Sequence, residues 1–259
     1  MISFIINAIK IIFLLGFLIL IHEGGHCIVA KLCKVKVNEF AIGFGKIIWQ
    51  KQGKETKYSI RLIPLGGFCS MEGETEESEE KGSFSKASVW RRMAIVVAGA
   101  TVNILFGILV YFILISTVGI QFVNPAKDTF FNRIYYGAKG TGEFIATIFD
   151  SIKILITGGI QTDQMVGIVG ISEVVVKTNG IINYLHLLAV ISVSLGVTNL
   201  LPIPALDGGK ILILLIEVIR RKPMKLETEA KIQLLGFSIL MALTIFVTYN
   251  DILRIGSCS

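Results

Sequence analysis

The first 27 residues of the chain read MISFIINAIKIIFLLGFLILIHEGGHC, an apolar run that ends in a cluster of polar side chains. A run of roughly 20 apolar residues can cross a bilayer as a helix, because a helical backbone satisfies its own hydrogen bonds. Lys10 lies inside the run and no small-x-small cleavage site precedes His22, so the segment differs from a signal peptide. The sequence therefore predicts a retained membrane-spanning helix over residues 2–27.

The composition of the whole chain is typical of a membrane protein. Of the 259 residues, 53% are hydrophobic and 17% are charged, and the mean hydropathy is +0.72. These values are too apolar for an ordinary soluble domain and exclude a typical nucleic-acid-binding protein. Three further runs have the length of a span, at residues 93–120, 180–203 and 232–249. We therefore expect a polytopic α-helical membrane protein with about four transmembrane helices, organised as a single domain over residues 1–259.

Basic residues are concentrated in two of the segments that separate the predicted spans. Residues 31–92 are rich in Lys and Arg, and residues 220–225 contain four more of them, whereas residues 121–179 contain only five, despite a +6 net charge overall. Lys and Arg accumulate in short cytosolic loops. We therefore expect a multi-pass protein of the plasma membrane with both termini extracytoplasmic, the 31–92 loop in the cytosol and the 121–179 loop outside.

The two long loops carry different local patterns. In Thr56–Ile63, apolar side chains alternate with polar ones, which predicts a half-buried strand and a small membrane-associated β-hairpin or sheet that ends at the turn Pro64–Phe68. Glu72–Glu80 contains six glutamates and is most simply a solvated loop, with substrate gating as the alternative. Outside the cytosol, Gly142–Gly158 has apolar residues at helical spacing, which predicts a helix lying in the membrane interface.

The polar cluster His22-Glu23-Gly24-Gly25-His26 has the pattern H-E-x-x-H. Residues four apart share a helix face, so the two imidazoles can bind one metal while Glu23 reaches water on that metal as a general base. Imidazole ligands suit Zn²⁺, which keeps one open position at catalytic sites. Two unrelated histidines are the alternative, but ionisable groups within a membrane span are costly and mark functional sites.

Two histidines require a third ligand, for which Asp207 is the best acidic candidate. It follows the third predicted span in the stretch NLLPIPALDGG, residues 199–209. Pro202 and Pro204 prevent a regular helix there, so the freed backbone must be buried in protein or line a wet cavity. Asp207 can also act as the N-cap of a helix over Gly209–Ile219, a role compatible with metal ligation. His186, roughly 30 Å from Asp207 along the helix, cannot share the metal and is expected to pack.

These motifs together resemble the site-2 protease family of intramembrane zinc metalloproteases, in its bacterial branch of regulated intramembrane proteolysis. The resemblance covers nearly the whole chain and rests on residues 22–26, 40–45 (FAIGFG), 61–68 (RLIPLGGF), 98–103 (AGATVN) and 199–209. The chain departs from many relatives at Gly99-Ala100, where Gly-Pro is common. The 59 residues 121–179 are also too few for the PDZ domain that relatives often carry, in addition to the interfacial helix.

The resemblance implies a Zn²⁺ cofactor held by His22, His26 and Asp207, with Glu23 activating water. It also implies that Asn199 binds substrate or stabilises the transition state, although Asn199 can instead be a polar residue at the proline-induced kink. The implied substrates are single-pass membrane proteins: an anti-sigma factor, a remnant signal peptide or a pheromone precursor. A catalytically inactive scaffold and a small transporter remain the alternatives. A transporter predicts ionisable groups spread along a path, whereas here they gather at the cytosolic ends of two spans.

A substrate helix must be opened before it is cut, because its peptide bonds are shielded by its own hydrogen bonds. We expect the predicted strand Lys57–Ile63 to offer an unpaired edge to which an unwound substrate adds as a further strand, with Ile60 and Leu62 as contacts. The alternative is that this hairpin only packs the cytosolic loop against the membrane.

Overall fold

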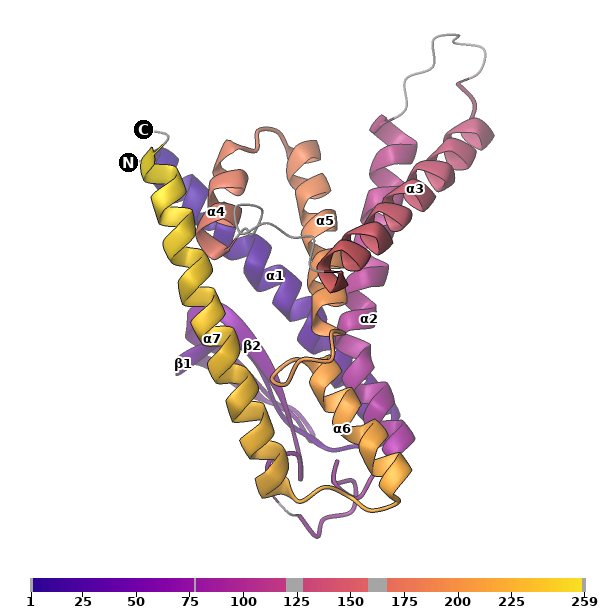
Figure 1. Cartoon of the computed structure of the whole chain (residues 1–259), viewed down its shortest axis with the longest axis vertical. Coiled ribbons are helices and arrows are strands. Elements are labelled where there is room, and N and C mark those ends of the chain that lie inside the picture. The colour runs from indigo at the N-terminus through magenta and orange to yellow at the C-terminus, as the bar shows by residue number, and fades with distance from the viewer. Residues whose placement is uncertain (1, 77, 120–127, 158–166, 258–259) are drawn as a thin grey trace. The chain divides into compact units, whose positions relative to one another are not determined.

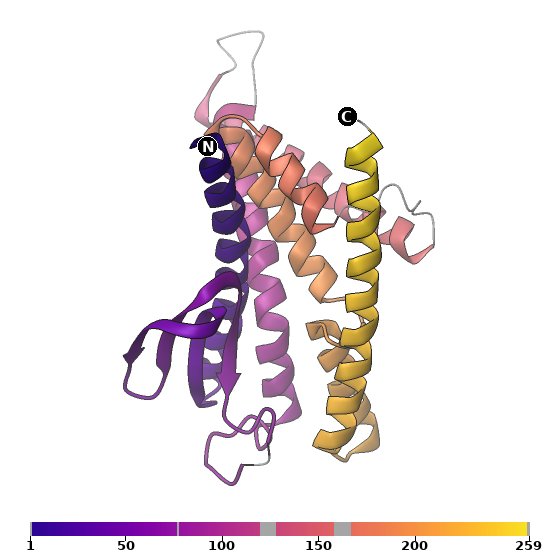
Figure 2. The ribbon, with the colours of Figure 1, turned by 90° about the vertical axis from the view of Figure 1, so that its left-hand side faces the viewer.

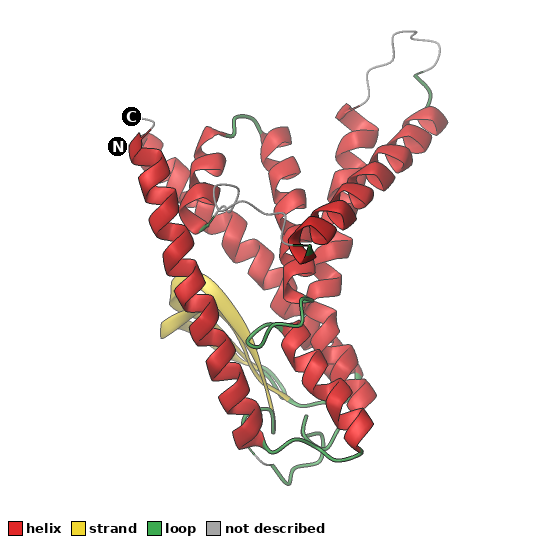
Figure 3. Cartoon of the chain, viewed as in Figure 1, coloured by secondary structure: helices red, strands yellow, loops and turns green. Residues whose placement is uncertain are grey.

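The computed structural model of the chain describes residues 2–76, 78–119, 128–157 and 167–257 (Figure 1). These residues are mainly helical, and the strands are confined to one small sheet (Figure 3). The helices are α1 (Ile2–Leu32), α2 (Val89–Leu114), α3 (Phe130–Ile156), α4 (Ile168–Lys177), α5 (Ile181–Asn199), α6 (Asp207–Arg220) and α7 (Leu226–Ser257), and a π-helical turn, Ile115–Gly119, continues α2.

Among the described residues, four helices are long and apolar enough to cross a membrane: Ile5–Leu32, Val89–Gly119, Ile181–Asn199 and Leu226–Leu253. The prediction of a polytopic α-helical membrane protein with about four spans is therefore confirmed. The third helix ends at Asn199, before the predicted boundary at residue 203, because Pro202 cannot donate a helical hydrogen bond.

The described part of the loop between the second and third of these helices forms α3 and α4 rather than a β-rich module. The predicted helix Gly142–Gly158 corresponds to α3, which begins twelve residues earlier at Phe130. Thr129 caps its start, since its hydroxyl accepts a hydrogen bond from the Asn132 amide. Gly158, the last residue of that prediction, lies outside the described residues.

The chain divides into two compact units. The first contains residues 1–104 and 195–242, and the second contains residues 105–194 and 243–259. In the second unit, Tyr111 stacks on Phe144, with ring centroids 4.1 Å apart, and also contacts the His186 ring. Asp251, which is 2% exposed, accepts a hydrogen bond from the Gly167 amide at the N-terminus of α4. All the candidate site residues belong to the first unit.

The sheet of the first unit consists of β1 (Val37–Gln52) and β2 (Lys57–Met71), and Figure 2 shows it beside α1. The prediction that β2 ends at the turn Pro64–Phe68 is wrong, because the strand continues through these residues to Met71. Gly66 accommodates the irregular backbone with a φ of 131°, a value that favours glycine. After it, Gly67 pairs with Ile42 and the ladder resumes.

The register of the sheet shows which segments form its interior. Residues 39–42 of β1 lie opposite residues 57–60 and also opposite residues 67–70. Ile60 is opposite both Ile42 and Trp49, so the segment 57–60 has partners on both sides. The expected unpaired edge along Lys57–Ile63 is therefore wrong for this segment, because the long β1 strand folds around it. The role of Ile60 in strand addition therefore loses its premise, whereas that of Leu62 stays a prediction.

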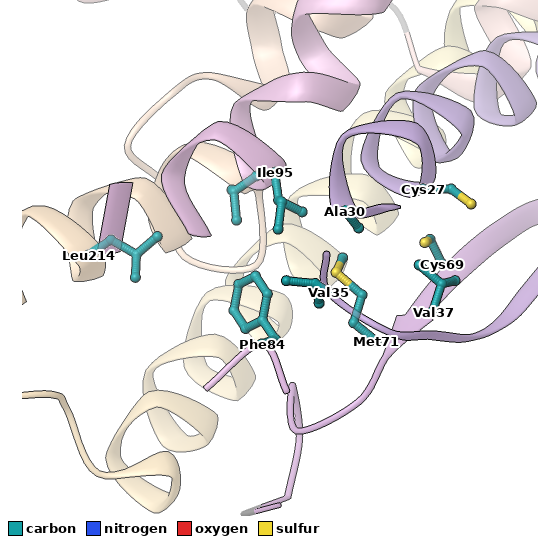
Figure 4. Close-up of a cluster of buried hydrophobic side chains, with 10 residues drawn as sticks. Cys27, Ala30, Val35, Val37, Cys69, Met71, Phe84, Ile95 and Leu214 are labelled. Carbon is teal, nitrogen blue, oxygen red and sulfur yellow. The ribbon is translucent and has the colours of Figure 1, made fainter. Parts of the chain in front are cut away.

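A buried cluster joins the sheet to the helices that carry the site (Figure 4). Ala30 of α1, Ile95 of α2 and Val37 of β1 are each at most 1% exposed. Cys69 and Met71, at the end of β2, pack into the same cluster. Packing of this kind holds the end of β2 against the helix that contains the H-E-x-x-H motif.

Candidate metal centre

His22 and His26 lie one turn apart on α1 and point toward the same spot. Each is 8% exposed, and their Nε2 atoms are 3.2 Å apart. The Asp207 Oδ2 atom lies 3.1 Å from Nε2 of His22 and 3.5 Å from Nε2 of His26. Tetrahedral zinc ligands at ordinary bond lengths are separated by roughly 3.3 Å. The two nitrogens and one oxygen therefore fit a zinc ion with a fourth position left open.

Asp207 reaches this spot because α6 begins with it. The N-cap residue is Leu206, and no side-chain hydrogen bond caps the helix, so the alternative role of Asp207 as N-cap is wrong. Its Oδ2 is buried with no hydrogen-bond partner, as expected of an atom that binds a metal. Burial by itself raises the pKa of Asp207, but the two imidazoles outweigh burial and lower the pKa, so the carboxylate is ionised at neutral pH.

The non-helical stretch between α5 and α6 is held by protein groups. Gln233 of α7 accepts a hydrogen bond from the Ala205 amide at 2.6 Å, satisfying backbone that the prolines removed from a helix. A Cβ on Gly208 would lie 2.1 Å from the Leu201 carbonyl oxygen, and a Cβ on Gly236 of α7 would lie 2.3 Å from that of Pro204. The stretch is thus packed between helices, which shields the backbone that the prolines leave outside a helix.

Helix α2 packs closely against α1 at the candidate metal site. A Cβ on Gly25 would lie 2.8 Å from the Ala98 carbonyl oxygen, and a Cβ on Gly99 would lie 2.3 Å from Nε2 of His26. The His26 Nδ1 atom is 2.8 Å from the Ile95 carbonyl oxygen, which can only accept. This contact places the His26 proton on Nδ1 and leaves the Nε2 lone pair for a metal.

A cavity of about 410 Å³ opens beside the two histidines. Its lining includes Glu23, one residue from His22 on α1, and the strand segment Phe68–Met71 at the end of β2. The Cys69 backbone amide hydrogen-bonds with the Glu23 carboxylate. The segment pairs with β1 and also lines the cavity, whereas Ile60 and Leu62 are absent from the described lining residues.

Two asparagine side chains also reach the centre. The Asn199 amide nitrogen, at the end of α5, is 3.4 Å from Nε2 of His22. The structure therefore brings Asn199 to the site, as the sequence predicted. Asn103 of α2 lies 3.4 Å from Nδ1 of the same histidine. The sequence contained Asn103 within a family-like segment but gave it no role, and only the crossing of the helices places it beside a metal-binding side chain.

The acidic loop after β2 is not simply solvated. Glu74 accepts a hydrogen bond from the Lys210 ammonium at 2.6 Å, and both line the cavity. Burial by itself lowers the pKa of Lys210, but the Glu74 carboxylate outweighs burial and the pKa is raised, so Lys210 stays charged. Lys210 lies one turn after Asp207, so the pair ties the loop to the helix that supplies the third ligand. Periodicity alone could not pair residues so distant in sequence.

An H-E-x-x-H motif on a helix long and apolar enough to cross a membrane, with an aspartate from a second helix and a cavity beside it, is the arrangement expected of an intramembrane metallopeptidase. Comparison with known proteins supports this class. The model of peptidase family M50 matches residues 10–243, and the chain belongs to this family, which comprises the site-2 proteases. The recognition made from the sequence motifs is thereby confirmed.

Relatives of the chain are similar over nearly its full length. A protein of Clostridium acetobutylicum that is named as a zinc metalloprotease is 31% identical over 95% of this chain and 97% of that protein. The zinc metalloprotease RasP of Bacillus licheniformis is 26% identical over 96% and 99%, respectively. The regulator of sigma-W protease RasP of Bacillus subtilis is 25% identical over 97% and 99%. The chain is accordingly a zinc metalloprotease of the site-2 protease family.

Proposed function

We propose that this enzyme is an intramembrane endopeptidase that cuts membrane proteins within or near their transmembrane segments. His22, His26 and Asp207 are its zinc ligands and Glu23 is its general base. The observation that carries the proposal is the convergence of three atoms within 3.5 Å of one another: two Nε2 atoms from a helix long and apolar enough to cross a membrane, and one carboxylate oxygen from α6. Hydrolysis beside such a helix requires a cavity that admits water, and His22, Glu23 and Asp207 line a cavity of this kind.

The residues divide the work of peptide hydrolysis. Zinc, when bound, supplies a Lewis acid and lowers the pKa of a water molecule toward 7. Glu23 lines the cavity beside both histidines, where it can accept a proton from water and later deliver it to the leaving amine. The Asn199 amide points its Nδ2 toward the same centre and is placed to donate to the carbonyl oxygen of the scissile bond.

The substrate must lie extended along the cavity for this chemistry. The side of Phe68–Met71 that faces the cavity offers strand backbone next to Glu23, and this edge replaces the Lys57–Ile63 edge expected from the sequence. An unwound substrate segment can form main-chain hydrogen bonds there, offsetting those lost from its own helix.

The proposed substrates are single-pass membrane proteins, namely an anti-sigma factor, a remnant signal peptide or a pheromone precursor. The name of one relative, regulator of sigma-W protease, supports the first class. The distribution of basic residues supports a plasma-membrane location with the active site toward the cytosol. An inactive scaffold or a small transporter is less well supported, because neither needs three ligand atoms and a glutamate around one cavity.

Two substitutions test the proposal on the purified full chain in detergent. Glu23→Gln should bind zinc like the wild type but lose cleavage of a single-pass model substrate, because the base is removed and all three ligands remain. Asp207→Asn should lose cleavage and also bind zinc more weakly. Metal content and cleavage are measured for both variants. Cleavage by Glu23→Gln at the wild-type rate would refute the assigned mechanism.

A further inference from the structure

The two imidazoles of the metal centre are contacted by α2 through their remote nitrogens. Both rings direct Nε2 toward Asp207, so Nδ1 of each faces away from the shared spot. Nδ1 of His26 meets the Ile95 carbonyl oxygen, an acceptor that fixes the ring and its tautomer. Nδ1 of His22 meets Asn103.

The contact is built into the spacing of α2. Ile95, Gly99 and Asn103 are four residues apart, so they follow one another along one face of the helix. The same spacing separates His22 from His26 on α1. Gly99, in the middle, leaves no room for a side chain, since a Cβ there would meet the His26 ring. One face of α2 therefore supplies a partner for each histidine in turn.

Asn103 is 0% exposed, inside a helix long and apolar enough to cross a membrane. An amide at such depth is costly unless it forms hydrogen bonds, which favours a specific role over an accidental one. Its neighbour Thr101 has no comparable role, because the Thr101 hydroxyl donates to the Val97 carbonyl within the same helix. The Asn103 side chain, by contrast, reaches a histidine of the centre.

We propose that Asn103 is a positioning residue, whose side-chain carbonyl accepts the Nδ1–H of His22 and so holds Nε2 ready to bind zinc. The inference rests on the proposed role of His22 as a zinc ligand. A histidine that binds metal through Nε2 carries its proton on Nδ1 and needs an acceptor there. The amide nitrogen and oxygen of Asn103 exchange places by a half-turn of the amide group, and the hydrogen-bond network decides which atom faces the ring. With Nδ1 protonated, that atom is Oδ1.

The hydrogen bond between Asn103 and His22 predicts an unusual order of zinc affinity among the Asn103 variants. Asn103→Leu keeps the volume but removes the acceptor, and the loss of such a contact weakens metal binding by about 10- to 100-fold. Asn103→Asp keeps an acceptor oxygen in place, and a carboxylate makes a bound imidazole a better ligand. If Asn103 merely filled space, the order of zinc affinity would be reversed, because leucine suits a membrane helix and a buried carboxylate does not.

The experiment measures the zinc dissociation constant of the full-length chain in detergent by competition with a chelator. The wild type is compared with Asn103→Leu, Asn103→Asp, His22→Ala and the control Thr101→Val, which removes a hydroxyl that donates within α2. We expect 10- to 100-fold weaker binding for Asn103→Leu, wild-type or tighter binding for Asn103→Asp, and no change for Thr101→Val. The visible spectrum of the cobalt-substituted protein should be altered for Asn103→Leu and preserved for Asn103→Asp.

Each outcome decides a separate claim. If Asn103→Leu binds zinc like Thr101→Val, or if Asn103→Asp binds as weakly as Asn103→Leu, the positioning role is overturned. Should Asn103→Leu fail to fold, Asn103→Asp decides alone, because only the acceptor role predicts that it keeps zinc. His22→Ala tests the underlying assignment: zinc binding at full strength by this variant would refute His22 as a ligand, whatever Asn103 does.

Discussion

The close approach of α2 to the metal centre makes Gly99→Ala an informative substitution. The added methyl group would lie 2.3 Å from Nε2 of His26, whereas ordinary contacts begin near 3.4 Å. Either the imidazole or the helix must move by about 1 Å to relieve this clash, which is five times the roughly 0.2 Å tolerance of a metal–ligand distance. We expect zinc affinity to fall by at least about 10-fold and cleavage by about 100-fold, the usual cost of a 1 Å misplacement at a reacting centre.

Gly24→Ala is the matched control for this change. Gly24 lies on α1 between the two histidines, yet a Cβ there would have nothing within 4 Å. Both substitutions add one methyl group to a glycine in a helix, so both change helix propensity in the same direction. Zinc affinity, measured by chelator competition, and cleavage of a model substrate should be nearly unchanged in Gly24→Ala. If Gly99→Ala matches Gly24→Ala in both assays, the inferred contact between α2 and the His26 ring is not the constraint that the structure indicates.

Two further predictions concern stability and orientation. Arg92 and Glu217 form a buried ion pair at 2.6 Å. Glu217→Leu leaves the arginine unpaired and should lower the free energy of unfolding by about 3–5 kcal/mol, measured by thermal unfolding of the detergent-solubilised protein. Adding Arg92→Met should recover most of this loss of stability. Recovery should be incomplete because Glu217 also accepts from the Met224 amide; no recovery would exclude the ion pair as the cause. In intact cells, an impermeant thiol reagent should label Cys258, which lies outside the described residues, and should label Cys33 only after permeabilisation. The opposite pattern would reverse the membrane orientation.

Much of the site follows from short-range chemistry that a sequence displays directly. The four-residue spacing of His22 and His26 sets both imidazoles on one face of a helix, whatever the helix packs against. The apolar runs had to be helices because lipid offers the backbone no hydrogen-bond partners. The prolines at 202 and 204 had to end the third span, and Asp207 was the acidic residue best placed beyond them.

The tertiary structure decided what depends on contacts between distant segments. The paired state of Ile60 comes from β1 folding around it, and alternation of polar and apolar residues reports only the faces of a strand, never its partners. Asn103, 81 residues from His22, and Glu74, 136 residues from Lys210, meet their partners only through helix crossing and loop packing. Asp207 illustrates both: the sequence shows its charge and its place after the prolines, but its position beside His22, one residue past the N-cap, depends on where α6 begins.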